Sequence, residues 1–330
     1  MLTVCLFSAC KGLGRGEVYV DLANALVDYN DLKVVLIAPA KALYLGRLNS
    51  RVQIQTYHSW NSRLNPFLRR ELKQMFQSLK ADIIHTHFGK ATEIYKQIAT
   101  SLPSVFLATK HNVRKGKAFE SVPFVTAVSP RAAASIHRDE ESVIQNAIQP
   151  TPKPRSRKPD GEFRLLSVGR LDPIKGYDRL INAMTQLPSH IHLRLLGDGE
   201  HRNKLEQLVN DASLNDRVEM PGFTENVAEE MANADLFVLS SHSEGNCVAL
   251  IEALFYAPLA VSTPVGAAEE VLGPEFLVDG DDLGKDLLKI INDYDRYRNE
   301  FTAHRKKIAV TYQWDHVAGQ YRDLYHRIAN

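Results

Sequence analysis

Two pairs of charged side chains in the second half of the chain have types and a spacing that suit chemistry. Glu244 and Glu252 lie eight positions apart, which on one helix separates them by roughly 12 Å at 1.5 Å per residue. That distance excludes a close, proton-sharing pair of carboxylates. Arg170 and Lys175 follow an apolar run, and a guanidinium with a nearby ammonium neutralises phosphate oxygens well. The alternative is that all four are solvated surface charges.

The segment between the two glutamates predicts the start of a helix. Gly245 and Asn246 precede an apolar stretch, and asparagine is a favoured N-cap. The free N–H groups of the first turn, expected at Cys247, Val248 and Ala249, form a site for an anion. A diphosphate at this end leaves one carboxylate for a sugar and the other for ribose hydroxyls.

Short apolar runs alternate with helical patterns in both halves of the chain, which indicates parallel sheets covered by helices. The predicted strands are Thr3–Phe7, Lys33–Ala38, Ile83–Thr86, Val105–Thr109, Val122–Val128, Phe163–Val168, His192–Leu196, Val218–Met220, Leu236–Ser240 and Leu259–Ser262. The predicted helices are Glu17–Tyr29, Asn65–Leu79, Tyr177–Leu187, Glu200–Ala212, Val227–Asn233, Asn246–Ala257 and Asp315–Ile328. The Pro-rich, basic stretch Gln149–Gly161 reads as a linker between two doubly wound halves. Ligands bind beyond the carboxyl ends of such strands, so the expected site is a central cleft between the halves.

The bulk composition narrows the class of protein. A length of 330 residues suits two domains, and no apolar run approaches a membrane-spanning length. The first nine residues lack a basic start and read as a buried strand rather than a signal peptide. Three cysteines make neither a disulfide framework nor a metal spacing, which fits a reducing cytosol.

The net charge of +1 conceals an asymmetry along the chain. Residues 1–160 contain 23 Lys and Arg against 12 Asp and Glu, whereas residues 161–330 contain 17 against 27. A basic half suggests that the N-terminal domain meets something anionic. Clustering of solvated charges by chance is the alternative.

The motifs together resemble glycosyltransferase family 4. Ser243–Glu252 resembles the family's E-x7-E motif, and Leu165–Gly176, which includes Gly169, resembles its G-R-x-x-x-x-K-G phosphate loop. The remaining matches run through the second half in order: Leu195–Glu200 resembles a glycine-rich turn, Pro221–Phe223 a segment lining the nucleobase, and Thr311–Asp315 the start of the last helix. One departure is Asn246-Cys247, where family members often carry Phe-Gly.

The resemblance implies an α/β GT-B fold of two Rossmann-like domains facing a cleft. The expected acceptor domain is 1–155, completed by 311–330, and the expected nucleotide-sugar domain is 160–310. The implied reaction is retaining transfer of a hexose or N-acetylhexosamine from a nucleotide-diphosphate sugar, with UDP the commonest donor in the family, and with no metal or other cofactor. Glu244, Arg170, Lys175 and His87 are the implied catalytic residues. The implied donor-binding residues are Glu252, Gly14, Gly16, Gly169, Gly245, Asn246, Cys247, Val248 and Phe223.

In the first half, Asp82–His87 is a strand that ends in two histidines. The family resemblance implies that His87 faces the donor sugar, and strand alternation puts His85 on the same face, one step deeper. A structural histidine and a metal ligand are the alternatives for His87. His111 also matches a recurrent family histidine, or is a capped loop residue. The loop Gly12–Glu17 is glycine-rich, which lets main chain approach a ligand, but its spacing is not that of a dinucleotide fingerprint.

The segment Trp60–Leu79 has apolar positions 64, 68, 72, 75, 76 and 79 on one helical stripe, with Arg69, Arg70 and Lys73 off it. This pattern indicates either a helix lying on an anionic membrane or an ordinary helix whose stripe faces the core. The favoured acceptor is a glycan or glycolipid, anionic because the first domain is basic, as in lipopolysaccharide core or exopolysaccharide synthesis. No nucleic-acid partner is expected. The expected location is the cytoplasm, with the inner face of the cytoplasmic membrane as an alternative.

Two other functions fit the same sequence. A sugar-nucleotide epimerase or hydrolase would keep the fold and consume donor without an acceptor. A non-catalytic module would dock its basic half on a membrane or polyanion and show no turnover. The presence of Arg170, Lys175, Glu244 and Glu252 together argues against a degenerate site.

Overall fold

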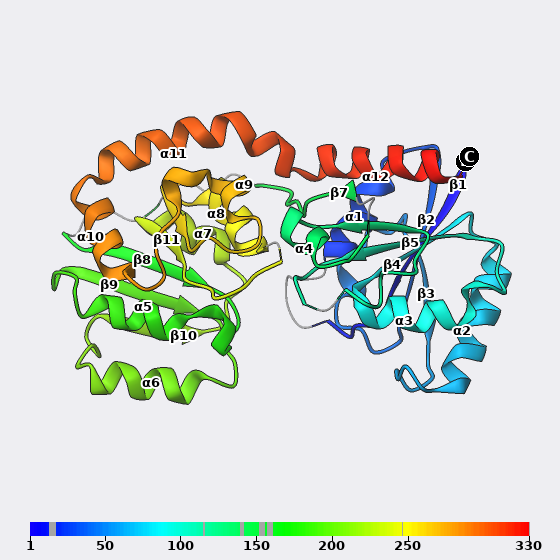
Figure 1. The fold of residues 1–330 in the computed structure, drawn as a ribbon, viewed down its shortest axis with the longest axis horizontal. Coiled ribbons are helices and arrows are strands. Elements are labelled where there is room, and N and C mark those ends of the chain that lie inside the picture. Colours follow the sequence, from blue (N-terminus) through cyan, green and yellow to red (C-terminus); the bar gives the residue numbers. More distant parts are fainter. Residues whose placement is uncertain are drawn as a thin grey trace. The chain divides into compact units, whose positions relative to one another are not determined.

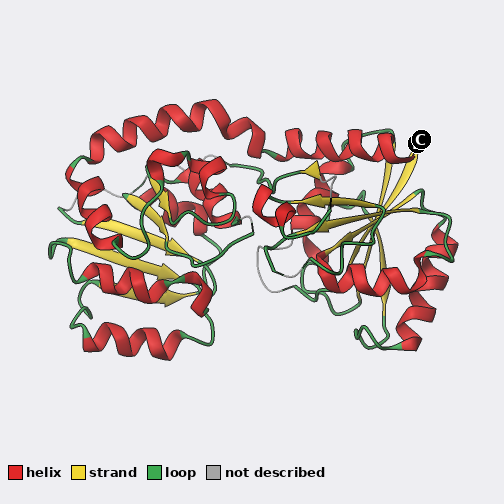
Figure 2. Cartoon of the chain, viewed as in Figure 1, coloured by secondary structure: helices red, strands yellow, loops and turns green. Residues whose placement is uncertain are grey.

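The structure, a computed structural model, describes residues 1–12, 18–114, 116–138, 142–151, 156, 161–245 and 247–329. The chain divides into two compact units. The N-terminal unit comprises Met1–Ile148 and Thr311–Asn330, and the C-terminal unit comprises Gln149–Val310. Each unit has a parallel sheet with helices packed around it (Figure 1; Figure 2). This confirms the predicted α/β class with two Rossmann-like domains.

The sheet of the N-terminal unit has the strand order β3-β2-β1-β4-β5-β6-β7 over the described residues. The chain order reverses between β1 and β4, where open α/β sheets bind ligands at their carboxyl edge. Ser8 and His87, the last residues of these two strands, lie side by side in the register. The strands are β1 (Leu2–Ser8), β2 (Leu32–Pro39), β3 (Gln53–Tyr57), β4 (Ile83–His87), β5 (Val105–Lys110), β6 (Phe124–Ala127) and β7 (Ser142–Val143).

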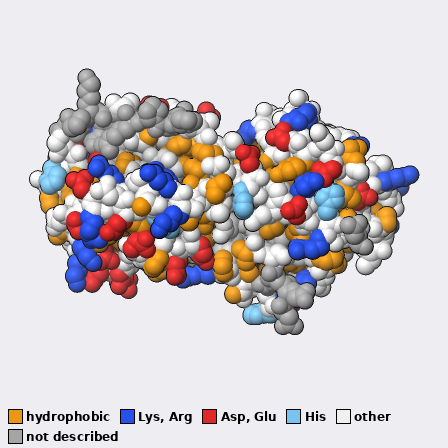
Figure 3. Space-filling view, turned by 90° about the horizontal axis from the view of Figure 1, so that it is seen from above, with side chains coloured by type: hydrophobic (Ala, Val, Ile, Leu, Met, Phe, Trp, Pro, Cys, Tyr) orange, Lys and Arg blue, Asp and Glu red, His pale blue; other side chains and the backbone are white. Residues whose placement is uncertain are grey.

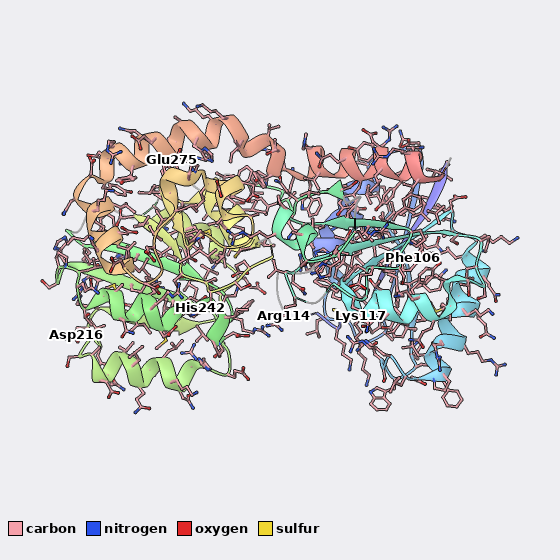
Figure 4. The ribbon with its side chains drawn as sticks, in the orientation of Figure 1. Phe106, Arg114, Lys117, Asp216, His242 and Glu275 are labelled. Atoms are coloured by element: carbon pink, nitrogen blue, oxygen red, sulfur yellow. The ribbon has the colours of Figure 1, made fainter. Side chains whose placement is uncertain are left out.

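Helices cover this sheet and bury its aliphatic and aromatic side chains. The core joins Phe7 of β1 to Phe76 of α2 and Phe106 of β5, the last of which is labelled in Figure 4. The final helix of the chain, α12, packs against α1 and completes the unit. The helices are α1 (Val18–Leu26), α2 (Pro66–Leu79), α3 (Phe88–Ala99), α4 (Pro130–Ala134) and α12 (Trp314–Ala329), with a 3-10 turn η1 (Leu45–Arg47).

The C-terminal unit has a parallel sheet of order β10-β9-β8-β11-β12 over its described residues. The chain order reverses between β8 and β11, so the loops after these two strands form the switch point. Its strands are β8 (Phe163–Val168), β9 (Ile191–Leu196), β10 (Val218–Gly222), β11 (Leu236–Leu239) and β12 (Ala260–Ser262). Its helical segments are η2 (Pro173–Lys175), α5 (Tyr177–Met184), α6 (Arg202–Asp211), α7 (Val227–Asn233), α8 (Val248–Tyr256), α9 (Ala268–Leu272), η3 (Pro274–Phe276), α10 (Leu283–Asn292) and α11 (Tyr294–Ile308), and η4 (Ala309–Tyr312) leads into α12.

The first residues form the buried strand that was predicted, β1. Among the described residues, no helix combines the length and the apolar character needed to cross a bilayer. Several elements were not predicted from the sequence, namely β3, β7, α3, α4, α9, α10 and α11.

Candidate active site

The loop after β8 brings Lys175 to the end of β11. Asp172 caps η2 by accepting a main-chain hydrogen bond at 3.2 Å. Gly176 follows with φ +61°, and a Cβ placed there would lie 2.2 Å from the carbonyl oxygen of Ser240. Only glycine permits this approach. Gly176 therefore determines the position of Lys175, the residue before it.

Lys175 forms an ion pair with Glu244 across the switch point. Lys175 Nζ lies 2.6 Å from Glu244 Oε1, and Ser241 Oγ donates to the same oxygen at 2.7 Å. The two charged side chains are only 18% and 12% exposed, so solvent screens this pair less than a surface pair. Ser241 was not identified from the sequence; its only signal was a hydroxyl at the carboxyl end of a buried strand.

The charge on Lys175 is maintained although the side chain is largely buried. Burial lowers the pKa of Lys175, but the neighbouring Cys247 and Glu244 outweigh it, and the pKa is raised overall. Burial, with Glu244 adding to it, raises the pKa of Cys247 to about 12. Because the thiol is therefore neutral at pH 7, Glu244 is the anion that holds Lys175 as an ammonium.

The N-terminus of α8 lies directly after this pair, with its cap one residue later than predicted. The helix begins at Val248 with Cys247 as its N-cap, whereas the sequence predicted Asn246 as the cap. Asn246 itself lies outside the described residues. The amide of Leu250 already donates to the Cys247 carbonyl at 3.0 Å, so the first turn closes immediately after the cap. The anion site predicted at the amides of residues 247–249 therefore falls on the cap residue and the first two residues of α8, and it stays a prediction.

Arg170 does not join the Lys175–Glu244 pair in this structure. Its guanidinium is 71% exposed and lies 2.7 Å from Asp172 Oδ2. The main chain beside it is held firmly, because a Cβ on Gly197 would lie 1.9 Å from the carbonyl oxygen of Gly169, and the Leu171 amide donates to the Asp198 carbonyl at 3.0 Å. The glycine-rich turn after β9 therefore supports the loop after β8 that contains Arg170.

The two residues predicted to bind the nucleoside are placed on different elements of the same unit. Glu252 lies half-buried in the second turn of α8. Phe223 follows β10 at the carboxyl edge of the sheet and is 67% exposed. Gly245 is buried before α8, and its carbonyl oxygen would be 2.7 Å from a Cβ on Gly266. His242, labelled in Figure 4, lies on the same loop after β11.

In the N-terminal unit, β4 ends in a buried pair of histidines, as alternation predicted. The rings of His85 and His87 are 4.2 Å apart. His85 Nδ1 bonds to Tyr325 Oη of α12 at 2.8 Å, and its Nε2 bonds to Thr109 Oγ1 at 2.6 Å. His85 is therefore satisfied on both nitrogens, and the sequence did not identify Tyr325 or Thr109 as its partners.

His87 also contacts His111, and both rings are neutral. His87 Nδ1 lies 3.1 Å from His111 Nε2. Among the residues that the structure describes, none forms a hydrogen bond with His87 Nε2, although the residue is 1% exposed. Burial, and then the neighbouring His85 and His111, keep the pKa of His87 well below its usual range, and burial lowers the pKa of His111 to about 3.

Two glycines predicted to approach the donor, Gly14 and Gly16, lie outside the described residues. The alternative that His87 is a metal ligand has no support from the arrangement of the described side chains. Within the part of the chain that is described, no group of three or more His, Cys, Asp or Glu side chains is arranged to hold a metal ion.

The C-terminal unit matches a known family almost end to end. The family model described as glycosyl transferases group 1 matches residues 149–307. A phosphatidylinositol N-acetylglucosaminyltransferase protein of Arabidopsis thaliana is 31% identical over 56% of this chain, but the match spans only 43% of that protein. The lipopolysaccharide core biosynthesis glycosyltransferase LpsE of Rhizobium meliloti is 25% identical over 85% of this chain and 83% of its own length.

The fold of the whole chain matches solved glycosyltransferase structures. Sucrose-phosphate synthase from Thermosynechococcus elongatus has a TM-score of 0.86 at 20% identity and covers 99% of both chains. HepE of Anabaena, solved in complex with UDP-glucose, has a TM-score of 0.84 at 16% identity, over 99% of this chain and 100% of that one. Residues 149–307 therefore match the group 1 glycosyltransferases, and the whole chain has the GT-B fold of these solved structures.

Proposed function

We propose that this glycosyltransferase moves a hexose or N-acetylhexosamine, with retention of anomeric configuration and without a metal, from a UDP-sugar to a hydroxyl of an anionic cell-surface glycan or glycolipid. The observation that carries the proposal is the ion pair between Lys175 and Glu244 at the switch point of the C-terminal sheet. It places one cation and one carboxylate beside the N-terminus of α8, where a diphosphate and its sugar need them.

In the proposed reaction, the bond between the anomeric carbon and the phosphate oxygen breaks and its electron pair stays on the leaving diphosphate. Lys175 and the first turn of α8 stabilise that developing charge, which is electrostatic catalysis by groups already in place. Arg170 turns from Asp172 to the diphosphate when donor binds. The acceptor oxygen attacks the same face of the sugar and passes its proton to the leaving phosphate.

Glu244 orients the donor sugar in this scheme, and Glu252 holds the ribose. Phe223 lines the nucleobase, and His87 contacts the sugar through its unpartnered Nε2. The roles are separate because eight positions divide the two carboxylates along the chain. A direct two-carboxylate displacement needs carboxyl groups about 5–5.5 Å apart, whereas here one precedes α8 and the other lies in its second turn.

The donor and acceptor classes are inferred from charge and from the relatives. HepE was solved with UDP and with UDP-glucose, and the Rhizobium relative is described as acting in lipopolysaccharide core biosynthesis. Exposed basic side chains follow three strands at the carboxyl edge of the N-terminal sheet: Lys11 after β1, Lys41 after β2, and Arg114 and Lys117 after β5, the last two labelled in Figure 4. They suit phosphates on an acceptor, and the proposed location is the inner face of the cytoplasmic membrane.

The test replaces each member of the ion pair and follows transfer with the donor found by a thermal-shift screen of sugar nucleotides. Lys175→Met and Glu244→Gln are expected to lower kcat by about 100-fold or more, because preorganised charge is lost at the leaving group and the sugar. The matched control is Lys204→Met, an exposed lysine of α6 in the same unit, which should transfer normally. Full transfer by either site variant removes the proposed roles.

Three further measurements separate the competing functions. Transfer that survives EDTA, with an α-linked product from an α-linked donor, supports the metal-free retaining reaction. Donor consumption without acceptor at the rate of the full reaction identifies an epimerase or hydrolase instead. Binding of donor with no turnover toward any acceptor identifies a non-catalytic module.

A further inference from the structure

The loop before α2 and the first turn of that helix expose three large apolar side chains. Trp60 is 82% exposed, Leu64 84% and Phe67 75%; these three residues are called the apolar tip here. The buried side of the helix is formed by other residues, because Leu68, Leu72 and Phe76 are at most 1% exposed. The core-facing stripe predicted from the sequence is therefore correct from residue 68 onward and wrong for Leu64, which precedes the helix.

Polar side chains form hydrogen bonds with the main chain of the apolar tip and of the loop that contains it. Asn65 caps α2 by accepting from the Phe67 amide at 3.0 Å, and its Nδ2 donates to the Trp60 carbonyl at 2.6 Å. One amide side chain thus links the main chains of two of the exposed apolar residues. Lys90 Nζ donates to the Asn61 carbonyl at 2.8 Å, and Gln97 Nε2 donates to the Arg63 carbonyl at 3.1 Å.

In the loop before α2, polar side chains make the contacts with the rest of the unit, whereas Trp60 and Leu64 face solvent. This is the reverse of the usual arrangement, in which apolar side chains face inward. The loop is fixed to α3 by hydrogen bonds from Lys90 and Gln97 and by the ion pair between Arg63 and Glu93. A surface that is already ordered loses little conformational entropy when it docks. The structure therefore presents a preformed apolar projection rather than a loosely packed loop.

The segment that forms the tip has a net positive charge. Trp60–Lys80 contains five Lys and Arg residues against one acidic residue, Glu71, and Arg63 forms an ion pair with Glu93 of α3. The Glu71 carboxylate accepts hydrogen bonds from the His58 and Ser59 amides at 2.8 and 2.9 Å, so it is engaged within the unit. Arg70 and Lys80 are exposed on the helix and Lys73 is half-buried.

We propose that the apolar tip and the basic residues of α2 dock this enzyme onto an anionic lipid bilayer. Tryptophan prefers the headgroup region, where its ring is apolar and its N–H stays wet. Each Lys or Arg near an anionic surface adds about 1 kcal/mol of attraction. Figure 1 shows α2 with the loop before it at the lower rim of the N-terminal unit, where the loop projects beyond the sheet. The docking extends the membrane location named with the proposed function and is tested apart from sugar transfer.

The experiment exploits the two tryptophans of the chain. Trp314 is 5% exposed, so a change in fluorescence on adding vesicles reports Trp60. With the full-length protein, vesicles of phosphatidylcholine plus phosphatidylglycerol are expected to shift the emission to the blue and to sediment the protein. Phosphatidylcholine alone should bind at least about tenfold more weakly, and added salt should weaken binding to the mixed vesicles.

Matched variants locate the surface. Trp60→Ser with Leu64→Ser and Phe67→Ser should lower vesicle affinity at least about tenfold, with an unchanged melting temperature and unchanged transfer to a water-soluble acceptor. Arg70→Gln with Lys73→Gln should weaken binding and reduce its salt dependence. Val310→Ser, which removes a side chain that is 60% exposed outside the tip, should bind like wild type.

Several results would overturn the proposal. Absence of wild-type binding to the mixed vesicles would do so, as would full binding by the triple variant. Concentration-dependent self-association that the triple variant abolishes would identify the tip as a contact between copies.

The Lys175→Met variant separates membrane docking from sugar transfer. It is expected to lose transfer to the soluble acceptor and to retain vesicle binding, which would show that the two properties are independent.

Discussion

Two buried histidines, His85 and His87, and the half-buried His111 carry no charge at neutral pH, and this makes the N-terminal unit sensitive to acid. His85 and His87 are 0% and 1% exposed, and burial is the largest cause that lowers the pKa of both, well below the ordinary 6.5. Burial also lowers the pKa of His111 to about 3. In the unfolded chain all three titrate near their usual value, so acid favours unfolding.

The expected outcome is a free energy of unfolding that is full above about pH 6.5 and falls as the pH drops toward the folded-state values. Each histidine that stays neutral in the folded state contributes a loss of up to about 1.4 kcal/mol per pH unit in that window. Urea unfolding at a series of pH values measures the slope, and His111→Gln should make it shallower. Asp31, whose pKa is lowered from 3.8 to about 2 chiefly by its bond from Arg322, loses its contribution only below about pH 4. Equal stability on both sides of pH 6.5 would contradict the neutral cluster.

The two residues of the central ion pair were predictable individually, but their contact was not. Lys175 and Glu244 belong to two motifs visible in the sequence, yet they are 69 positions apart. Their meeting depends on the close approach of Gly176 to Ser240, which is a property of the folded sheet. The cap of α8 was predicted one residue too early. Asparagine is the better N-cap by residue type, but Cys247 occupies the cap position in the folded chain.

At the scale of elements, strands with strong apolar runs and helices with clear stripes were predicted, and ambiguous ones were missed. The edge strand β3 contains Gln53, Gln55 and Thr56, so its apolar signal is weak. α3 begins at Phe88, immediately after β4 ends, with no turn residues between them. Phe88 makes the corner with φ +66°, a conformation that favours glycine. α11 is highly charged and buries only Tyr297 and Phe301.

The helix α12 supports the histidine pair through one hydroxyl, and this predicts a measurable cost. Tyr325→Phe keeps the buried ring but leaves His85 Nδ1 without its 2.8 Å partner, which should destabilise the N-terminal unit by about 1–3 kcal/mol. Tyr29→Phe is the matched control, since its hydroxyl makes only a 3.3 Å bond, to the Asp315 carbonyl, at the other end of α12. Urea unfolding compares the two variants, and an equal effect of both would show that the buried contact has no special weight.

At the scale of the whole molecule, the opposite charges of the two halves follow the two units. The N-terminal unit, with its returning C-terminal segment, contains 21 Lys and Arg against 13 Asp and Glu, and the C-terminal unit contains 19 against 26. On the face shown in Figure 3, both signs of charge lie interspersed over each unit. The positive excess therefore acts through particular sites, such as the carboxyl-edge loops and α2, rather than through one continuous patch on that face.

The division of the chain also predicts which pieces fold. Residues 149–310 contain the whole β8–β12 sheet and its helices, so this fragment is expected to fold alone and to bind the nucleotide. Deletion of residues 311–330 removes α12 and with it six buried side chains, Trp314, Val317, Ala318, Tyr321, Leu324 and Tyr325. At about 1.5–3 kcal/mol for each large one, that loss is comparable to the whole stability of an ordinary domain, about 5–15 kcal/mol. The N-terminal unit should therefore unfold in the truncated chain.

The measurement is a thermal-shift titration with UDP on the full chain, the truncated chain and the fragment 149–310. Because a ligand stabilises only the folded unit that binds it, UDP should raise the melting temperature of the fragment and of one transition in the truncated chain. Lys175→Met in the fragment is the control and should reduce the shift. A fragment that is folded but insensitive to UDP would show that the donor site needs residues of the N-terminal unit. A truncated chain that keeps both transitions would show that α12 is dispensable for that unit's core.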